Sequence, residues 1–387
     1  MSRWRLLFVD NLAVEAARRS VYRELSRRKE FEVHLMAPTN WKEAGNTIVC
    51  EEEQDLELTI HKSHFLFGHR AHRVLYASLP QLVRKLQPHF LYVDTEPENY
   101  LALEAILTVK LFSPNTRLGV VSSRNIDHRI TGFPYKLAFT HRFCDNILLK
   151  RIDMCFLRAK AAALVIGPHV RRTCYIPFPV DCKFFEKKLT PSRNKAQGRL
   201  TIGFLGRFVE SKGIRLLLEI MPGLPSNVDV LMVGKGPMLD EIYDLTKRLQ
   251  LENRVKVLSA VRYSQVPALL NQIDVLVLPS LSTKYWVEQC PRVLIEAMAC
   301  EVPIVASRSG GIPDVVGDAG ILFESGDAHD FADKLLKLLN DAEMRRDTGR
   351  VGRARALSEF DVSVIAGRLA SAICEMLQGN PQSALTG

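Results

Sequence analysis

Short runs of apolar residues alternate with longer stretches of mixed character along the whole chain. An apolar run of about four to eight residues predicts a buried strand, and apolar positions at helical spacing predict an amphipathic helix. In the first half of the chain, the pattern predicts strands at 5–9, 31–36, 90–94 and 117–121 and helices near 15–28 and 98–112. In the second half, it predicts strands at 200–205, 228–233, 255–258, 274–278 and 303–306 and helices near 212–221, 237–250, 264–271, 291–299 and 328–339. Strands and helices in turn indicate an α/β fold with doubly wound parallel sheets.

The elements fall into two series, separated by a polar segment. Residues 187–199 are charged and contain Pro and Gly, so we expect a linker between a first domain at 1–186 and a second domain at 200–360. Each of these domains has an ordinary length. Residues 361–387 predict a helix that packs back toward the first domain, followed by a polar tail. Two Rossmann-like domains that face each other leave a cleft, and we expect a ligand to bind there.

Charge is spread unevenly between the two halves of the chain, whose formal net charge is +9. Residues 1–200 hold 32 Lys and Arg against 20 Asp and Glu, whereas residues 201–387 hold 20 against 23. This excess predicts either an anionic partner for the first half, such as a lipid surface, a phosphorylated acceptor or nucleic acid, or simply a well-solvated surface. Residues 61–90 place histidines, arginines and lysines among apolar residues, which fits a membrane-surface patch or an ordinary surface helix.

Two features bear on the compartment. No apolar run approaches the roughly 18 residues of a membrane span, and the apolar core of the N-terminal segment is too short for a signal peptide. The eight cysteines form no Cys-x-x-Cys pair and lack the histidine spacing of a zinc site, which favours reduced thiols. We therefore expect a cytoplasmic protein. A peripheral position at the inner face of the membrane is also compatible with these features.

Two glutamates eight positions apart, Glu288 and Glu296, are the strongest candidates for a functional site. They follow the strand expected at 274–278, Pro291 suits the first position of a helix, and the residues from Arg292 onward favour a helix. Ligands of open parallel sheets bind beyond the carboxyl ends of the strands, where both glutamates would lie. Carboxylates accept hydrogen bonds from sugar hydroxyls, and a helix N-terminus suits a phosphate. A surface salt bridge between Arg292 and Glu296 would also explain the spacing.

Three glycine-containing turns follow other strands of the second domain. The first contains Gly206, Arg207 and Lys212, and its two cations suit a diphosphate, although an exposed turn with two cations is common. The second spans 233–237 and the third spans 309–314, where the backbone would approach a nucleotide or a phosphate closely. A simple tight turn would also explain either one. All three follow strands of one expected sheet, so together they are more specific than any one alone.

The order and spacing of these motifs resemble the retaining glycosyltransferases of family 4, which have the GT-B fold, over nearly all of residues 200–360. The segment 204–213 resembles the Gly-Arg…Lys-Gly loop of that family, 233–237 its Gly-x-Gly-Pro turn, and 288–296 its Glu-x7-Glu element. The segment 297–323 continues the resemblance in register. The resemblance implies an α/β protein of GT-B type, with two Rossmann-like domains facing each other across a cleft.

The resemblance also implies a role for each matching residue of the second domain. Arg207 and Lys212 would hold the diphosphate of the donor. Glu296 would bind the ribose hydroxyls, and Glu288 would contact the transferred sugar, so Glu288 and the two cations form the expected catalytic set. The remaining donor-binding positions are Gly206, Gly234, Val257, Arg292 and Val293. Of these, Gly234 and Val257 would border the base.

The first domain resembles the family more weakly. Asn125 and His128 match a region that faces the cleft in relatives and are the expected acceptor-side residues, although a polar loop explains them equally well. The loop at 10–14 lacks the glycine pair that many relatives bring to the sugar phosphate. In the second domain, Cys290 and Pro291 stand where Phe-Gly is common, and proline offers no N–H to a sugar. These departures leave the sugar preference open.

The implied reaction is the transfer of a hexose from a nucleotide diphosphate sugar to an acceptor hydroxyl, with retention, in glycan, lipopolysaccharide or glycolipid assembly. No Asp-x-Asp triplet occurs, which favours a metal-independent site, and we expect no cofactor besides the nucleotide sugar itself as co-substrate. The expected partners are this donor and an anionic or lipid-linked acceptor, and not nucleic acid. A non-catalytic binding subunit of the same fold and a nucleotide-sugar epimerase are the alternatives.

Overall fold

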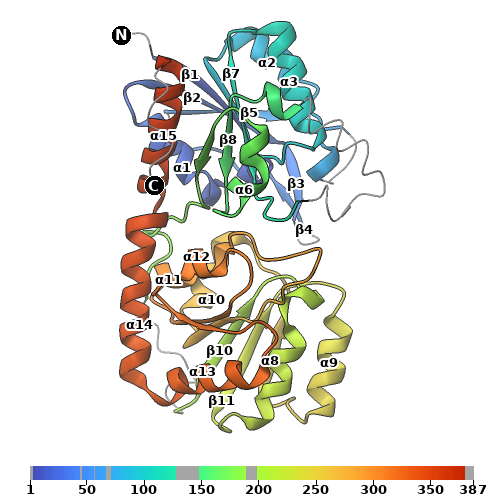
Figure 1. The fold of residues 1–387 in the computed structure, drawn as a ribbon, viewed down its shortest axis with the longest axis vertical. Helices are drawn as coiled ribbons and strands as arrows, with labels where there is room; N and C mark the ends of the chain where they lie inside the picture. The colour runs from blue at the N-terminus through green and yellow to red at the C-terminus, as the bar shows by residue number, and fades with distance from the viewer. Residues whose placement is uncertain are drawn as a thin grey trace. The chain divides into compact units, whose positions relative to one another are not determined.

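The computed structural model describes residues 3–43, 46–55, 57–66, 71–127, 148–188 and 198–379. Contacts between residues divide the chain into two compact units. Unit 1 comprises Met1–Pro177 together with Val362–Gly387, and unit 2 comprises Phe178–Asp361. Each unit holds a parallel sheet with helices packed against it, as the alternation of apolar runs predicts (Figure 1).

Unit 1 is built on a seven-stranded sheet, within the described residues, in the order β5-β2-β1-β6-β7-β8-β9. All neighbouring strands in this sheet are parallel. The strands are β1 (Trp4–Val9), β2 (Phe31–Pro38), β5 (Leu58–Ser63), β6 (Phe90–Val93), β7 (Arg117–Ser122), β8 (Met154–Leu157) and β9 (Thr173–Tyr175), with a separate antiparallel pair, β3 (Asn40–Glu43) and β4 (Asn46–Val49). The α-helices are α1 (Ser20–Ser26), α2 (Leu79–Leu86), α3 (Tyr100–Phe112), α6 (Ala162–Ile166) and α15 (Val362–Gln378).

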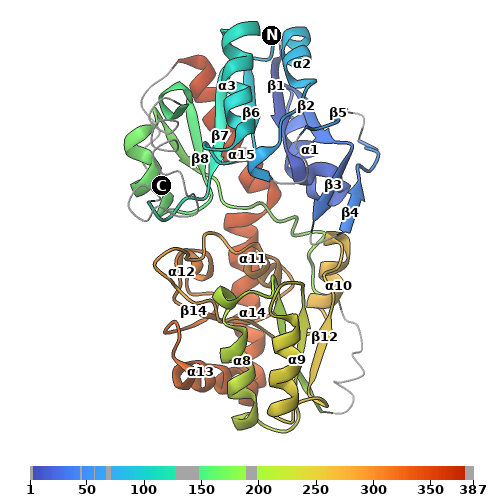
Figure 2. The same ribbon diagram turned by 90° about the vertical axis from the view of Figure 1, so that its right-hand side faces the viewer.

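Unit 2 has a six-stranded parallel sheet in the order β12-β11-β10-β13-β14-β15. Its strands are β10 (Leu200–Leu205), β11 (Val228–Val233), β12 (Val255–Leu258), β13 (Val275–Leu278), β14 (Ile304–Ser307) and β15 (Ile321–Phe323). Its α-helices are α8 (Ile214–Ile220), α9 (Leu239–Arg248), α10 (Val266–Leu270), α11 (Arg292–Ala299), α12 (Ile312–Val316), α13 (Ala328–Asn340) and α14 (Ala342–Arg355), after which a π-helical turn covers Ala356–Phe360. Figure 2 shows α8 and α9 side by side on one face of this sheet.

The chain passes between the units twice. Residues 178–186 pack with unit 2, where Val180 N–H donates to the carbonyl of Phe360 at 2.9 Å. The boundary predicted from the sequence lies later, at 186, and most of the expected linker, 189–197, lies outside the described residues. Helix α15 belongs to unit 1, where it packs against α1 and places Ile365, Leu369 and Ile373 in the core.

The central strands of both sheets are buried on both faces, which explains why these strands are continuously apolar rather than alternating. The last four residues of β1 and all four residues of β13 are buried. In the described part of the chain, no helix is both long enough and apolar enough to cross a membrane.

Candidate functional site

The candidate residues of unit 2 gather at the carboxyl edge of its sheet. Strands β10 and β13 are parallel neighbours, so the loop after β10 and the loop after β13 leave the sheet at the same edge. Strand β14 pairs with β13 on the other side and sends its own loop to this edge. The edge lies where ligands of open α/β sheets bind. The predicted convergence of the turns is therefore present in the structure.

Lys212 and Glu288 meet at this edge in an ion pair between Lys212 Nζ and Glu288 Oε1. The side chain of Glu288 is only 6% exposed, and its Oε1 also accepts a hydrogen bond of 2.5 Å from Ser280 Oγ. The ring of Trp286 lies 5.2 Å from Lys212 Nζ, at cation–π distance. The carboxylate is thus buried but neutralised, and its orientation is set by two donors.

The loop after β14 holds the backbone at Glu288 in place. Gly311 N–H donates to the carbonyl of Glu288 at 2.8 Å. Gly310 has a φ of +53°, and a Cβ atom at this position would lie 2.0 Å from the same carbonyl oxygen. Only glycine fits such a close approach and such a φ without strain. Ser307 Oγ, at the end of β14, donates to the carbonyl of Ser280 at 2.6 Å and joins the two loops again.

Helix α11 carries Glu296 into the interior. The helix begins at Arg292, and Pro291 is its N-cap, with φ −71° and ψ 100°. The prediction that Pro291 is the first helical residue was therefore wrong by one position, because the ψ of Pro291 is extended while its carbonyl already accepts from Leu294 N–H at 3.0 Å. Glu296 is the fifth residue of the helix and is only 5% exposed. A salt bridge on the surface does not account for a glutamate that is buried.

The surroundings of the Arg292 side chain indicate a ligand-binding position. Its guanidinium carbon lies 4.4 Å from the centre of the Phe178 ring and 6.0 Å from that of Tyr263. Its Nε is buried and has no hydrogen-bond partner among the described residues. A buried donor without a partner costs free energy, so a ligand that supplied an acceptor here would bind favourably. Val293 follows in the first turn of α11 and packs against the core of unit 2.

The turns after β10 and β11 lie against each other. A Cβ atom on Gly234 would lie 1.9 Å from the carbonyl oxygen of Gly206, so the two backbones pack directly. Arg207 is exposed between them and forms no ion pair or side-chain hydrogen bond with any described residue. Val257 is half-buried in β12, where it pairs with Met232 of β11. Arg207 is therefore a cation available to a ligand at this edge.

A pocket beside the Lys212–Glu288 pair was not predicted from the sequence. It has a volume of about 540 Å³ and contains four hydroxyl side chains and one carboxylate. Hydroxyls and carboxylates both exchange hydrogen bonds with a polyhydroxylated ligand. The serines that follow β13 and β15 were the available signal, but serine in a loop is too common to single out. The lining residues are Val209, Glu210, Ser211, Leu281, Ser282, Thr283, Ser325 and Gly326.

Unit 1 has a buried carboxyl group at the carboxyl edge of its own sheet. Glu96 accepts hydrogen bonds of 2.7 Å from Ser122 Oγ and from Ser123 N–H. Burial and, to a smaller extent, the neighbouring carboxylate of Glu98 raise the pKa of Glu96 to about 7. Asn125 follows β7 nearby, whereas His128 lies outside the described residues. Glu96 was not predicted as a site residue, because its hydrogen-bond donors, Ser122 and Ser123, come from a different strand and its loop.

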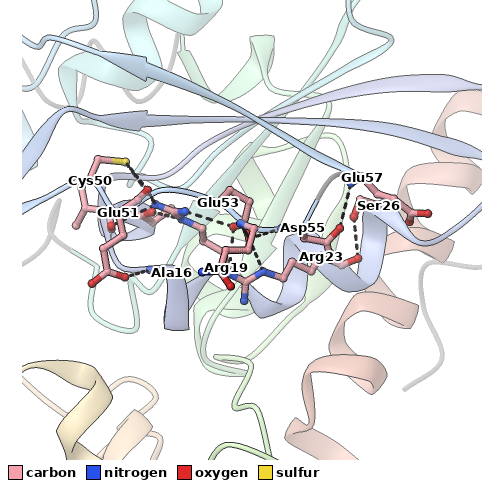
Figure 3. Close-up of polar contacts among 12 residues, drawn as sticks. Ala16, Arg19, Arg23, Ser26, Cys50, Glu51, Glu53, Asp55 and Glu57 are labelled. Atoms are coloured by element: carbon pink, nitrogen blue, oxygen red, sulfur yellow. Dashed lines mark hydrogen bonds and ion pairs between the residues drawn. The ribbon is translucent and has the colours of Figure 1, made fainter.

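The loop after β1, which lacks the glycine pair, is a 3₁₀ turn (Asn11–Val14) fixed by a buried arginine. Arg19 has no exposed surface, and its guanidinium donates to the carbonyl of Ala13 at 2.7 Å and to that of Glu51 at 2.7 Å (Figure 3). Glu53 completes the contacts by pairing with Arg19 at 3.3 Å and with Arg23 at 3.0 Å. The backbone of this loop is thus held by hydrogen bonds to a buried, paired arginine.

A match to a known protein family lies within unit 2. Residues 185–355 match the model of the family described as glycosyl transferases group 1. The N-acetyl-alpha-D-glucosaminyl L-malate synthase of Bacillus anthracis is 33% identical over 184 residues, which are 46% of this chain and 46% of that protein. A capsular polysaccharide biosynthesis glycosyltransferase of Staphylococcus aureus is 32% identical over 199 residues, or 50% of each chain. The chain spans about half the length of these curated relatives.

Solved structures confirm the fold of the whole chain. The sucrose-phosphate synthase of Thermosynechococcus elongatus superposes with a TM-score of 0.74 over 98% of this chain and 100% of that one, at 18% identity. The Anabaena protein HepE, in complex with UDP and glucose, superposes with a TM-score of 0.70 over 96% of this chain and 100% of that one, at 19% identity. The predicted α/β fold of GT-B type is thus confirmed. Among the described residues, no three His, Cys, Asp or Glu side chains are grouped to hold a metal ion.

Proposed function

We propose that this chain, whose residues 185–355 carry the glycosyl transferases group 1 domain, is a glycosyltransferase that moves a sugar from a nucleotide diphosphate donor to an acceptor hydroxyl. The observation that carries the proposal is the buried pair of Lys212 and Glu288, with Glu296 and Arg207 at the same edge of the unit 2 sheet. A cation–carboxylate pair beside a free arginine serves both parts of a nucleotide sugar, its anionic diphosphate and its hydroxyls.

The donor lies along the edge from β12 to β14. Arg207 and Lys212 hold the diphosphate, because a guanidinium grips phosphate oxygens in a fork and an ammonium adds a mobile charge. Glu296 accepts from the ribose hydroxyls. The base rests on Val257 and on the turn at Gly234, where the missing side chain lets the turns after β10 and β11 pack closely. Arg292 and Val293 complete the donor contacts at the start of α11, together with Gly206.

In the proposed reaction, the acceptor oxygen attacks the anomeric carbon while the bond from that carbon to the diphosphate oxygen breaks. The acceptor proton passes to the leaving diphosphate on the same face, so the configuration is retained, as in family 4. Negative charge grows on the diphosphate during this step, and Arg207 and Lys212 stabilise it. Glu288 orients the sugar through its hydroxyls. The residues need no metal ion for this chemistry, since two cations already face the diphosphate.

The proposed acceptor is a growing glycan or a lipid-linked glycan, and the transferred sugar is a hexose. One relative acts in capsular polysaccharide biosynthesis. Another is named as a mannosyltransferase that uses GDP-mannose and a phosphatidylinositol mannoside. The excess of cations over carboxylates in residues 1–200 also suits an anionic acceptor.

A thermal-shift screen of UDP, GDP and ADP, each with its common sugars, tests the proposal. A donor that binds only the folded chain raises the midpoint of unfolding. We expect one nucleotide and its sugar conjugate to do so, and the increase to disappear in the Arg207→Ala variant. If none of these compounds shifts the midpoint, the donor site does not exist.

A further inference from the structure

Helix α3 of unit 1 presents a row of large apolar side chains to solvent. Leu103, Leu107 and Leu111 follow one another at about one helical turn and are 38%, 48% and 69% exposed. Phe112 is exposed by 38%, and Tyr100 by 49%. The opposite face of α3 is buried in the core of unit 1. The helix is therefore apolar on both faces, whereas a helix that packs on a core normally has a polar outer face.

Exposed cations lie beside the C-terminal end of this row. Helices α2 and α3 lie side by side, as both views show (Figures 1 and 2). Gln87, just after α2, donates to the carbonyl of Phe112 at 2.8 Å, so the C-terminal ends of the two helices meet. Arg84 and Lys85 in the last turn of α2 and Lys110 of α3 are exposed. None of these three forms an ion pair with a described residue.

The carboxylates of the same region point elsewhere. Residues 79–117 contain four acidic residues, and each is held by a partner within unit 1. The partners are Arg158 for Asp94, Ser122 and Ser123 for Glu96, Arg124 for Glu98 and the N–H of Tyr76 for Glu104. Residues 79–117 thus give the exposed surface at the ends of α2 and α3 apolar side chains and positive charge, and their own carboxylates are held elsewhere.

We propose that this surface docks the protein on an anionic membrane. The α3 patch, as we call it, consists of Leu107, Leu111 and Phe112 with Arg84, Lys85 and Lys110. Its apolar side chains enter the boundary between head groups and acyl chains, and its cations meet anionic head groups. A second copy docked here by a two-fold axis would bring these cations face to face with themselves, which is unfavourable. The inference stands whether or not the chain transfers a sugar.

Co-sedimentation of the full chain with vesicles tests this proposal. We expect binding to vesicles of phosphatidylcholine and phosphatidylglycerol, weaker binding as salt is added, and little binding to phosphatidylcholine alone. Replacing Arg84, Lys85 and Lys110 by Gln should lower the partition constant about fivefold per cation. The Leu107→Gln/Leu111→Gln variant should lower it at least about tenfold. Glutamine is a good helix former, so α3 should remain folded.

Matched substitutions elsewhere separate docking from a general loss of charge or apolar surface. Lys247→Gln/Arg248→Gln removes two cations from the last turn of α9 in unit 2, and Leu164→Gln removes a leucine that is 84% exposed on α6. Both variants should bind anionic vesicles as the parent does. Equal binding of the parent and the α3 patch variants, or no binding by the parent, would overturn the proposal. A parent dimer that the Leu107→Gln/Leu111→Gln variant converts to a monomer would assign the patch to a second copy instead.

Discussion

Lys212 and Glu288 lie 76 positions apart in the chain and form an ion pair at the carboxyl edge of the unit 2 sheet. Ser280 Oγ and the backbone N–H of Gly311 also donate hydrogen bonds to Glu288. Lys212 therefore neutralises and orients a buried carboxylate, and in the proposed function the same ammonium group binds the diphosphate of the donor. This pair links the stability of unit 2 to its proposed chemistry.

Replacement of Lys212 separates these two roles. Lys212→Met should lower the free energy of unfolding by about 1–3 kcal/mol, because it leaves the buried carboxylate of Glu288 unpaired. Adding Glu288→Gln should recover most of that loss without restoring turnover. Denaturant unfolding and steady-state rates of the two variants measure both effects. Arg215→Met, which breaks an exposed ion pair between Arg215 of α8 and Glu241 of α9, should change little. If the double variant regains turnover, Lys212 has only a structural role.

Glu296→Ala should weaken binding of the nucleotide sugar by roughly 1.5–3 kcal/mol, about ten- to a hundredfold, because a charged hydrogen-bond acceptor is lost. Calorimetric titration with the donor found by the thermal-shift screen measures the change. Glu301→Ala is the matched control, since Glu301 lies just after the same helix and pairs with Lys187 at 2.9 Å. Parent-like affinity of Glu296→Ala would remove Glu296 from the donor site.

Gly310→Ala should damage the site through the backbone. Its φ of +53° and the approach of the new Cβ to the carbonyl of Glu288 should together cost roughly 1–3 kcal/mol or more and displace Glu288. Gly198→Ala is the matched control, because Gly198, just before β10, also has a positive φ of +68° but no atom within 4 Å of an added Cβ. Denaturation midpoints and donor affinities of both variants measure the loss of stability and the damage to the site. Equal effects of the two substitutions would mean that the contact with Glu288 is unimportant.

Glu104 should make unit 1 less stable as the pH rises. Burial raises the pKa of Glu104 to about 7, against the hydrogen bond from Tyr76 N–H, which favours the carboxylate. The unfolded value is 4.5, so the proton on Glu104 contributes its full stabilisation below pH 4.5, and this contribution is lost between pH 4.5 and about 7. Glu104→Gln should therefore unfold at a higher temperature than the parent at pH 8, and the difference should vanish near pH 4.

Glu53 serves as a control, because its contribution to stability should change with pH in the direction opposite to that of Glu104. Burial opposes its ionisation, but hydrogen bonds from Arg23, the Asp55 N–H and Arg19 outweigh burial and hold the pKa of Glu53 below its usual value. Its contribution is present above pH 4.5 and is lost as the pH falls below it. Glu53→Gln should thus be less stable than the parent at neutral pH. If both glutamine variants change stability equally at all pH values, neither carboxyl group titrates as described.

Much of unit 2 was predictable from the sequence because its strands are buried on both faces and appear as uninterrupted apolar runs. The same pattern placed Glu288, Arg207 and Lys212 after neighbouring strands, so their gathering at one edge followed from parallel topology. The contact between Lys212 and Glu288 itself was not predictable, because it depends on how two separate loops bend. The support from Ser280 and Gly310 depends on those loops as well.

Unit 1 was predicted less completely. Strands β5, β8 and β9 and the pair of β3 and β4 were not predicted, since they are short and several carry polar residues. The helix expected at 15–28 is a 3₁₀ turn followed by a shorter helix, α1. Nothing in the local pattern shows that Arg19 is fully buried, because its acceptors include the carbonyl of Glu51, 32 positions away. A buried arginine can be predicted only once its distant partners are known.

The most direct test of the central claim is the release of nucleotide diphosphate from the donor, measured with and without glycan or lipid-linked acceptors, for the parent, Arg207→Ala and Lys247→Ala. The proposed function predicts release that requires an acceptor, that is lost in Arg207→Ala although its fold is intact, and that is unchanged in Lys247→Ala. Two results would contradict the proposed function: conversion of the nucleotide sugar to another nucleotide sugar without release of nucleotide diphosphate, or an Arg207→Ala variant that is as active as the parent.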